Sequence, residues 1–308
     1  MATETTAILT LALGGPDSLE DVEAYLTDVR HGRPTSPELV AEFRERYRRI
    51  GGKSPLRDIT TRQAKGLEAK LGSDGYRVRA YVGMRHWHPY VREAVAGIAR
   101  DGLRKIVALC LTPYYSRMSV GAYFDAVKEA VRTQGLSLDV AYVDSWNDVP
   151  SLADAFAQGT SASLAAFAQE GFHDPYVLFT AHSLPRKIIE QGDPYEKELI
   201  ETMEAIRARL PPIRSRLAYQ SAGRTADPWL GPPFEEVIED LGKKGEKAIL
   251  VVPFGFVSDH LEILYDVDIT AKERAERLGV RLERTPSLNG EPKFIESMAT
   301  AVRPKLTP

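Results

Sequence analysis

An internal duplication constrains the fold of this chain more than any other feature of its sequence. Segment 105–116 (KIVALCLTPYYS) is similar to segment 247–256 (KAILVVPFGF) when Pro113 is aligned with Pro253. Upstream, a strand-like run that ends in GMRHWHP (83–89) precedes a helical pattern, as does SAGRTADP (221–228). Both pairs are about 140 residues apart. The duplication predicts two similar lobes. Chance similarity is the alternative, since strand–proline–helix patterns are common in α/β proteins.

The hydrophobic pattern alternates short β-branched runs with longer amphipathic segments. This alternation predicts parallel strands joined by crossover helices, an α/β fold of two Rossmann-like lobes whose sheets are flanked by helices. The expected strands are Ala7–Leu13, Arg77–Gly83, Lys105–Leu111, Leu138–Val143, Tyr176–Ala181, Arg216–Gln220, Ala248–Pro253 and Arg281–Arg284. The expected helices are Leu19–Thr27, Pro37–Ile50, Thr60–Lys70, Tyr90–Asp101, Gly121–Gln134, Ser151–Gln169, Tyr195–Arg209, Pro233–Gly242 and Pro292–Ala301.

The change from one lobe to the other falls near Val149. We therefore expect a first lobe over residues 1–148 and a second over 149–308, with the last helix able to pack back on the first lobe. Parallel sheets place ligand sites at the carboxyl ends of their strands. Two such sheets predict a ligand cleft between the lobes.

Composition narrows the function classes. The 308 residues carry 40 basic and 43 acidic side chains, a formal charge of −3, which gives no electrostatic reason for binding nucleic acid or an anionic membrane. The start, MATETTAILTLALGGP, lacks a basic region, and its apolar run is too short for a spanning helix. Cys110 stands alone, so an intrachain disulfide or a cysteine-ligated cluster cannot form. We expect a cytoplasmic protein.

Two glycine-rich segments fail as nucleotide motifs. Gly51-Gly52-Lys53-Ser54 would end a phosphate-binding loop only with a glycine at position 47, where this chain has Tyr47. Gly14-Gly15-Pro16 lacks the third glycine of a dinucleotide fingerprint. A transferase that uses a sugar nucleotide is therefore poorly supported.

Two polar residues follow buried-looking strands of the second lobe. His182 ends VLFTAH (177–182), and Glu262 comes shortly after strand 248–253. An imidazole at a strand end can take a proton near neutral pH or bind iron(II). The alternative for His182 is a hydrogen-bonded residue with no chemical role. His260, two residues before Glu262, is expected to be a hydrogen-bond support for it.

A row of polar, mostly acidic residues follows Glu262 along the chain. If the segment after Ser258 is α-helical, Glu262 and Asp266 share a face that Thr270 and Glu273 continue. Such a row could pass a hydrated cation inward, whereas a solvated acidic face is the commoner outcome of this spacing.

Five segments together resemble signature blocks of the ferrochelatases, in the family's order and spread over almost the whole chain. They are LGGP (13–16), GGKSPL (51–56), AHSLP (181–185), DPWLGP (227–232) and GFVSDHLE (255–262). The resemblance implies a type II chelatase fold and an enzyme of haem biosynthesis that inserts ferrous iron into a porphyrin. It further implies that iron is a substrate, that no organic cofactor is needed, and that the chain is a monomer.

The resemblance also assigns roles in the metal site. His182 matches the family histidine that takes pyrrole protons or meets the metal, and Glu262 matches its partner carboxylate across the cleft. Asp266 matches one member of an outer acidic path, but Thr270 stands where some relatives have another acid. A second, outer metal site is therefore doubtful.

Residues that hold the propionates in bacterial relatives acting on coproporphyrin III are matched by type: Arg30, Arg46, Tyr47, Ser54 and Tyr123. Arginine and hydroxyl groups suit carboxylates, although an arginine-rich helix face around Arg46 is usually only solvated. The polar strip HGRPTSP (31–37) differs from the apolar lip of relatives that dock on membranes.

Leu13 and Trp229 also match porphyrin-site positions of the family, but the role of each differs or is open. Several coproporphyrin-type relatives have an iron-ligating tyrosine where this chain has Leu13. Trp229 is either a wall of the porphyrin cleft or an ordinary core residue.

Insertion of iron into coproporphyrin III is favoured over three alternatives. The first is a ferrochelatase that acts on protoporphyrin IX. The second is a chelatase for another metal and tetrapyrrole, because imidazole and carboxylate do not select iron by affinity. The third is a non-catalytic protein that binds haem or porphyrin.

Overall fold

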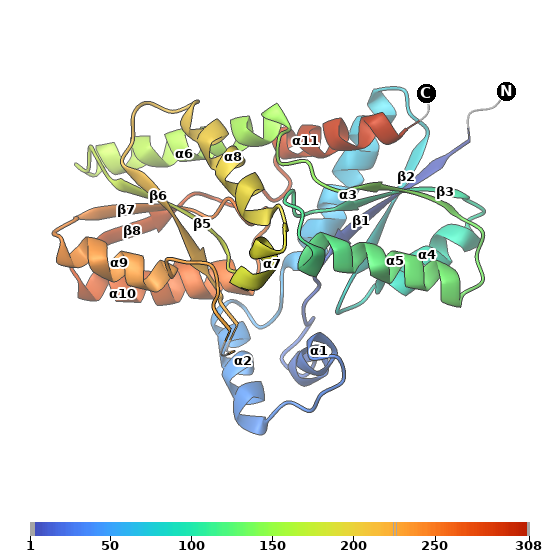
Figure 1. Ribbon diagram of the computed structural model, residues 1–308, viewed down its shortest axis with the longest axis horizontal. Coiled ribbons are helices and arrows are strands. Elements are labelled where there is room, and N and C mark those ends of the chain that lie inside the picture. The colour runs from blue at the N-terminus through green and yellow to red at the C-terminus, as the bar shows by residue number, and fades with distance from the viewer. Residues whose placement is uncertain (1–3, 224, 226, 307–308) are drawn as a thin grey trace. The chain divides into compact units, whose positions relative to one another are not determined.

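The computed structural model describes residues 4–223, 225 and 227–306, and its contacts divide the chain into two compact units (Figure 1). Unit 1 comprises Met1–Val149 and Asn289–Pro308, and unit 2 comprises Pro150–Leu288. Both units are α/β, and each contains one parallel sheet.

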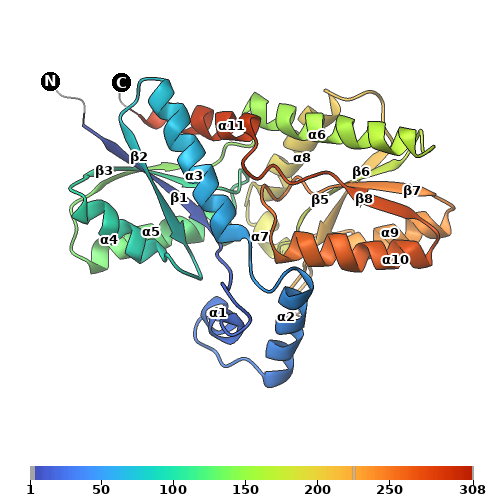
Figure 2. The ribbon, with the colours of Figure 1, turned by 180° about the vertical axis from the view of Figure 1, so that it is seen from behind.

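Unit 1 contains a sheet of strand order β2-β1-β3-β4, made of β1 (Thr6–Ala12), β2 (Val78–Met84), β3 (Lys105–Cys110) and β4 (Asp139–Val143). Every residue of β1 is buried, as expected for a central parallel strand covered on both faces. Helices α4 and α5 cover one face, and α3 and α11 cover the other (Figures 1 and 2). The helical segments are α1 (Val22–Val29), α2 (Pro37–Arg49), α3 (Leu56–Ser73), α4 (Val91–Arg100), π-helix η1 (Arg117–Gly121), α5 (Ala122–Thr133), α11 (Pro292–Val302) and 3₁₀ turn η3 (Arg303–Lys305).

Unit 2 repeats this plan, with strand order β6-β5-β7-β8 for β5 (Tyr176–His182), β6 (Ser215–Gln220), β7 (Ala248–Val252) and β8 (Arg281–Arg284). Here α6 and α8 lie on one face of the sheet, and α9 and α10 on the other (Figure 1). The helical segments are α6 (Pro150–Gln169), α7 (Arg186–Glu190), α8 (Tyr195–Arg207), α9 (Phe234–Lys243), π-helix η2 (Glu262–Ala271) and α10 (Lys272–Arg277).

The two units match beyond their strand order. Each has a π-helix after its third strand, η1 in unit 1 and η2 in unit 2. In each, an isolated bridge joins the second strand to the start of the next helix, Met84 to Tyr90 and Tyr219 to Pro233. The two similar parallel-sheet lobes predicted from the duplication are therefore confirmed.

The last helix belongs to the unit formed by the start of the chain. Because Gly66 of α3 has no side chain, Ile295 of α11 packs against it; a Cβ at Gly66 would lie 2.9 Å from Ile295 Cδ1. On the other side, the rings of Phe294 and Trp146 are 5.7 Å apart. The compact unit that carries β5–β8 consequently ends at Leu288, before the expected boundary at residue 308.

The expected strands agree with the observed ones to within two residues at each end. The helices α7 and α10 have no expected counterpart. The segment that begins at Glu262, for which α-helical spacing was the condition of a shared acidic face, is a π-helix. Within the described residues, every helix is too short or too polar to cross a membrane.

Candidate active site

His182 and Glu262 meet at the carboxyl edge of the unit 2 sheet. His182 is the last residue of β5, and Glu262 begins η2, which follows the neighbouring strand β7. Because both strands run parallel, their ends share one edge, and Nε2 of His182 lies 3.8 Å from Oε2 of Glu262. Both side chains are about one-third exposed, 35% and 29%, so they are open to a ligand.

The backbone around His182 holds its imidazole in one orientation. Nδ1 of His182 pairs with the carbonyl oxygen of Ser183, which can only accept, so Nδ1 carries a proton and the lone pair of the neutral imidazole is on Nε2. The Ser183 hydroxyl donates to the carbonyl of Leu230 at 2.8 Å. The basic nitrogen of His182 therefore faces the Glu262 carboxylate.

A buried tyrosine supports the same strand end. Tyr195, at the start of α8, donates from its hydroxyl to the carbonyl oxygen of His182 at 3.0 Å. Burial, followed by the negative charge of Glu262, raises the pKa of Tyr195 well above its usual range. Its phenol thus stays protonated and remains a donor at all ordinary pH values.

Glu262 has a fixed backbone and an unsatisfied carboxylate oxygen. Its backbone N–H donates to Nδ1 of His260 at 3.2 Å, which confirms the predicted support. Burial lowers the pKa of His260, which keeps its ring neutral and able to accept. Within the described part of the chain, Oε2 of Glu262 is buried and has no hydrogen-bond partner. A buried carboxylate oxygen in this state is suited to a proton or a cation.

The acidic row after Glu262 does not follow the expected α-helical spacing. Residues 262–271 form a π-helix, whose i→i+5 bonds put more residues in each turn. Positions four apart therefore no longer stack in one row. Asp266 and Thr270 are therefore rotated progressively away from the line above Glu262, and Glu273, in α10, is exposed. Among the described residues, no group of three or more His, Cys, Asp and Glu side chains is arranged to hold a metal.

Trp229 is tied to the segment that follows His182. An antiparallel bridge pairs it with Pro185, and the flanking Leu230 donates its N–H to the carbonyl of Leu184 at 2.9 Å. Its indole lies against Gly223, where an added methyl group would collide with the ring. Trp229 is partly exposed, so it is not an ordinary core residue.

Three of the expected porphyrin residues gather around the loop that follows β1 in unit 1. Ser54 donates its N–H to the carbonyl of Pro16 at 2.9 Å, and a Cβ at Gly15 would lie 2.5 Å from Ser54 Oγ and 3.7 Å from Tyr47 Oη. Glycine at position 15 therefore permits this close approach. Leu13, in the same loop, is 39% exposed and offers an apolar surface at the strand end.

The other three expected porphyrin residues have different surroundings. Arg46 donates to the Glu42 carboxylate at 2.6 Å, one turn earlier on α2. The exposed Arg30 caps the C-terminus of α1. Tyr123 is buried in α5, and its ring centroid is 5.7 Å from the guanidinium carbon of Arg85. Burial raises the pKa of Tyr123 well above its usual range, so this phenol is a permanent donor.

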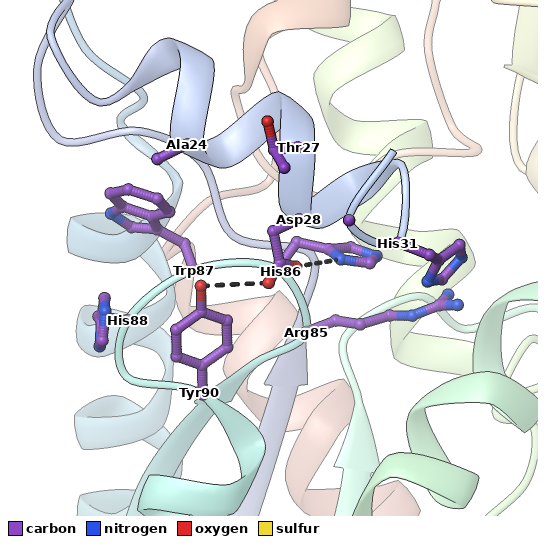
Figure 3. Close-up of a pocket in the computed structure, with 10 residues that line it drawn as sticks. Ala24, Thr27, Asp28, His31, Arg85, His86, Trp87, His88 and Tyr90 are labelled. Atoms are coloured by element: carbon purple, nitrogen blue, oxygen red, sulfur yellow. Dashed lines mark hydrogen bonds and ion pairs between the residues drawn. The ribbon is translucent and has the colours of Figure 1, made fainter. Parts of the chain in front are cut away.

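A pocket of about 740 Å³ opens in unit 1 between α1 and the segment that follows β2. Figure 3 shows the Arg85 guanidinium close to the His31 imidazole, with Asp28 bonded to His86. Asp28 accepts from His86 at 2.7 Å and from the Tyr90 hydroxyl at 3.3 Å. Among the described residues, Arg85 forms no ion pair. The lining residues are Ala24, Thr27, Asp28, His31, Gly32, Arg85, His86, Trp87, His88 and Tyr90.

Sequence reasoning missed Tyr195, Gln220 and Arg85. Gln220 ends β6, the strand next to β5, and its side-chain amide donates to the Glu262 carbonyl at 3.4 Å. Gln220 could have been recognised from the sequence, because it stands at the end of a strand as His182 does. Arg85 had the same signal, because it directly follows β2. Tyr195, at the start of α8, carries no such local signal, because the fold brings its partner to it.

Solved structures show which class of protein has this fold. SirB from Bacillus subtilis with Fe3+ is similar at 12% identity over 97% of this chain and 94% of that one, with a TM-score of 0.59. The sirohydrochlorin chelatase SirB from Bacillus subtilis subspecies spizizenii, in complex with cobalt, is similar at 10% identity with a TM-score of 0.56, covering 97% and 94%. The fold is therefore that of the type II chelatases.

Sequence comparisons identify the family within that class. The Ferrochelatase family model matches residues 5–306. The ferrochelatase of Deinococcus radiodurans is 40% identical over 300 residues, which are 97% of this chain and 95% of that protein. The coproporphyrin III ferrochelatase of Oceanobacillus iheyensis is 38% identical over 308 residues, covering 99% and 98%. The chain belongs to the ferrochelatase family, enzymes that insert iron into porphyrins.

Proposed function

We propose that this enzyme inserts Fe²⁺ into coproporphyrin III, with His182 as proton acceptor and Glu262 as the carboxylate that receives the metal. The observation that carries the proposal is the pairing of two unsatisfied atoms. A free imidazole Nε2 lies 3.8 Å from a carboxylate Oε2 that has no hydrogen-bond partner in the described chain. Metal insertion requires both a proton acceptor and a metal-binding anion.

The reaction exchanges two pyrrolic protons for one Fe²⁺ ion. His182 accepts the two protons one at a time as a general base and passes the first to solvent before it takes the second, because Nδ1 is held by the Ser183 carbonyl and only Nε2 can accept. Glu262 binds the hydrated ion, displaces part of its water shell and offsets its charge. Binding energy from the propionates and from the indole of Trp229 would sustain the bent macrocycle that exposes the nitrogen lone pairs.

Preference for coproporphyrin III is supported by the cations of unit 1. Coproporphyrin III carries four propionates and protoporphyrin IX carries two. Arg30, Arg33 and Arg85 form no ion pair among the described residues, and of these three Arg85 lines the pocket, together with His31. Guanidinium groups bind carboxylates well, and the Tyr123 phenol and Ser54 hydroxyl can complete the shell. Arg46 can contribute only in competition with Glu42.

Leu13 limits how the product is held. Leucine has no lone pair for iron, so the metal in the product is bound by His182 or by solvent. Leu13 instead offers its exposed side chain to a face of the macrocycle. Asp266 is proposed as a weak outer contact for the incoming ion.

The test is anaerobic metallation by the purified protein, with Fe²⁺ and either coproporphyrin III or protoporphyrin IX. We expect a higher kcat/KM for coproporphyrin III. A preference for protoporphyrin IX would reject the four-propionate assignment while leaving iron insertion in place. Tight porphyrin binding without turnover would instead indicate a carrier protein.

Two further expectations accompany this function. The enzyme acts without an organic cofactor, so metallation should need only porphyrin and metal. It is expected to be a cytoplasmic monomer, which light scattering and fractionation would test.

A further inference from the structure

Gln220 is buried at the same sheet edge as His182 and Glu262. It is the last residue of β6 and is paired in register with His182 of the neighbouring strand β5. Residues in register on parallel strands direct their side chains to the same face of the sheet. Gln220 is 2% exposed.

The carboxamide of Gln220 contacts the metal-site backbone with only one of its two ends. Nε2 donates to the carbonyl oxygen of Glu262 at 3.4 Å, at the first residue of η2. The main-chain carbonyl of Gln220 accepts from the N–H of Ser183 at 2.8 Å, directly after His182. The side-chain oxygen Oε1 is buried and has no hydrogen-bond partner in the described chain.

Burying a hydrogen-bond acceptor without a donor costs free energy of folding. The fold itself does not require an acceptor at position 220. An apolar side chain of similar size would fill the space at the end of β6 without that loss. Buried groups of this kind are uncommon in native proteins and call for a specific explanation. Two further side-chain oxygens at this edge also lack a hydrogen-bond partner among the described residues: Oγ of Ser221, next to Gln220, and Oε2 of Glu262, which the proposed metal would satisfy.

We propose that Gln220 is a third member of the metal-insertion site. Its Oε1 accepts a hydrogen bond from a water ligand of the incoming Fe²⁺ ion, while its amide holds the first residue of η2. Because the amide oxygen is neutral, it can bind a water ligand of the Fe²⁺ ion without adding a negative charge that would hold the ion at Glu262. This inference rests on the proposed function, because it needs a metal ion beside Glu262.

The test is the Gln220→Leu variant, assayed for Fe²⁺ insertion with each substrate varied in turn. We expect the KM for Fe²⁺ to rise about tenfold, since hydrogen bonds that involve charged groups are the strong ones. The KM for coproporphyrin III should stay within twofold, and the Tm should be unchanged or higher. A purely structural glutamine predicts the reverse, a lower Tm with an unchanged KM for Fe²⁺, and that result would overturn the proposal.

Gln63→Leu is the matched control. Gln63 is also fully buried, and its amide donates to the carbonyl of Asn289 at 2.7 Å within unit 1. This variant should lower the Tm and leave both KM values unchanged.

If the leucine variant does not fold, Gln220→Met is the second variant, because it keeps the length of the side chain and removes the oxygen acceptor. Its KM for Fe²⁺ should rise as expected for Gln220→Leu, and an unchanged KM would contradict the role of the oxygen. Calorimetric titration of the porphyrin-free protein with Co²⁺ alone separates this inference from the proposed function, because it needs no turnover. Weaker Co²⁺ binding by Gln220→Leu supports the inference, and equal binding overturns it.

Discussion

Nε2 of His182 and Oε2 of Glu262 are 3.8 Å apart, too far for a hydrogen bond. Each group is therefore held by other contacts and not by its neighbour: the imidazole by the Ser183 carbonyl, and the Glu262 backbone by His260. An imidazole nitrogen and a carboxylate oxygen thus face each other at the same edge without a hydrogen bond between them. This relationship leads to the first two predictions.

Replacing His182 by alanine should reduce kcat for iron insertion by at least about 100-fold, because general-base catalysis contributes that much. Porphyrin binding should persist, since the propionate contacts are elsewhere. Stopped-flow absorbance gives the rate, and fluorescence quenching gives the porphyrin Kd. The exposed His173→Ala is the control and should behave as wild type. Full metallation by His182→Ala would defeat the assignment.

Replacing Glu262 by glutamine should lower kcat/KM for Fe²⁺ by about 100-fold, because the charge that offsets the metal is lost. The side chain keeps its size, so the Tm should change little. Varying Fe²⁺ at saturating porphyrin measures the effect. Glu276→Gln, on the exposed side of α10, is the matched control. Equal kcat/KM values for the two variants would remove Glu262 from the mechanism.

Substrate choice should depend on the unpaired arginines of unit 1. Arg30→Gln and Arg85→Gln should each raise the KM for coproporphyrin III by about tenfold, with a smaller effect on protoporphyrin IX. Arg92, whose guanidinium carbon is 4.0 Å from the Tyr90 ring centroid, gives the control Arg92→Gln. If all three variants had equal effects on both porphyrins, propionate recognition by Arg30 and Arg85 would be excluded.

Two glycine substitutions should have opposite effects on stability. A Cβ at Gly255 would lie 2.5 Å from Ala181 Cα, so Gly255→Ala should cost about 1–3 kcal/mol and displace the neighbouring His182. Gly97 in α4 has open space around its Cα, so Gly97→Ala should add about 0.5–1 kcal/mol. Urea denaturation measures both, and a stable, fully active Gly255→Ala would show that this close approach is not needed.

The stability of unit 1 should depend on His86 in acid. Burial lowers the pKa of His86 from its ordinary value of 6.5, against the opposing effect of Asp28. Below pH 6.5 the unfolded chain takes up this proton before the folded chain does, so the free energy of unfolding falls as the pH drops. Above pH 6.5 the titration of His86 does not change the free energy of unfolding. His86→Gln should weaken the slope of Tm between pH 7.5 and about 5.5, and an unchanged slope would contradict this.

Most of the secondary structure could be predicted because its signals are local. The strands β1, β3, β5 and β7 are short, largely apolar and almost wholly buried runs, and no distant contact is needed to recognise them. The duplication added the topology, since one lobe's strand order repeats in the other. His182 and Glu262 could be singled out because His182 ends one strand and Glu262 comes after another strand of the same lobe, near the edge where parallel sheets collect their ligands.

The π-helix could not be predicted from the same patterns. Its hydrogen bonds differ from those of an α-helix by one residue, and the apolar spacing of 262–271 does not distinguish the two. The row of Glu262, Asp266, Thr270 and Glu273 was therefore expected and is not present as such.

The sequence alone determined the fold class, the family and the two residues that end or follow adjacent strands, because these depend on short-range order and motif identity. Tertiary structure alone decided that Tyr195 donates to the carbonyl of His182, that Gln220 reaches Glu262, and that Arg85 lies beside Tyr123. These pairs are separated by many residues, and only packing of the sheet and its helices brings their atoms within reach.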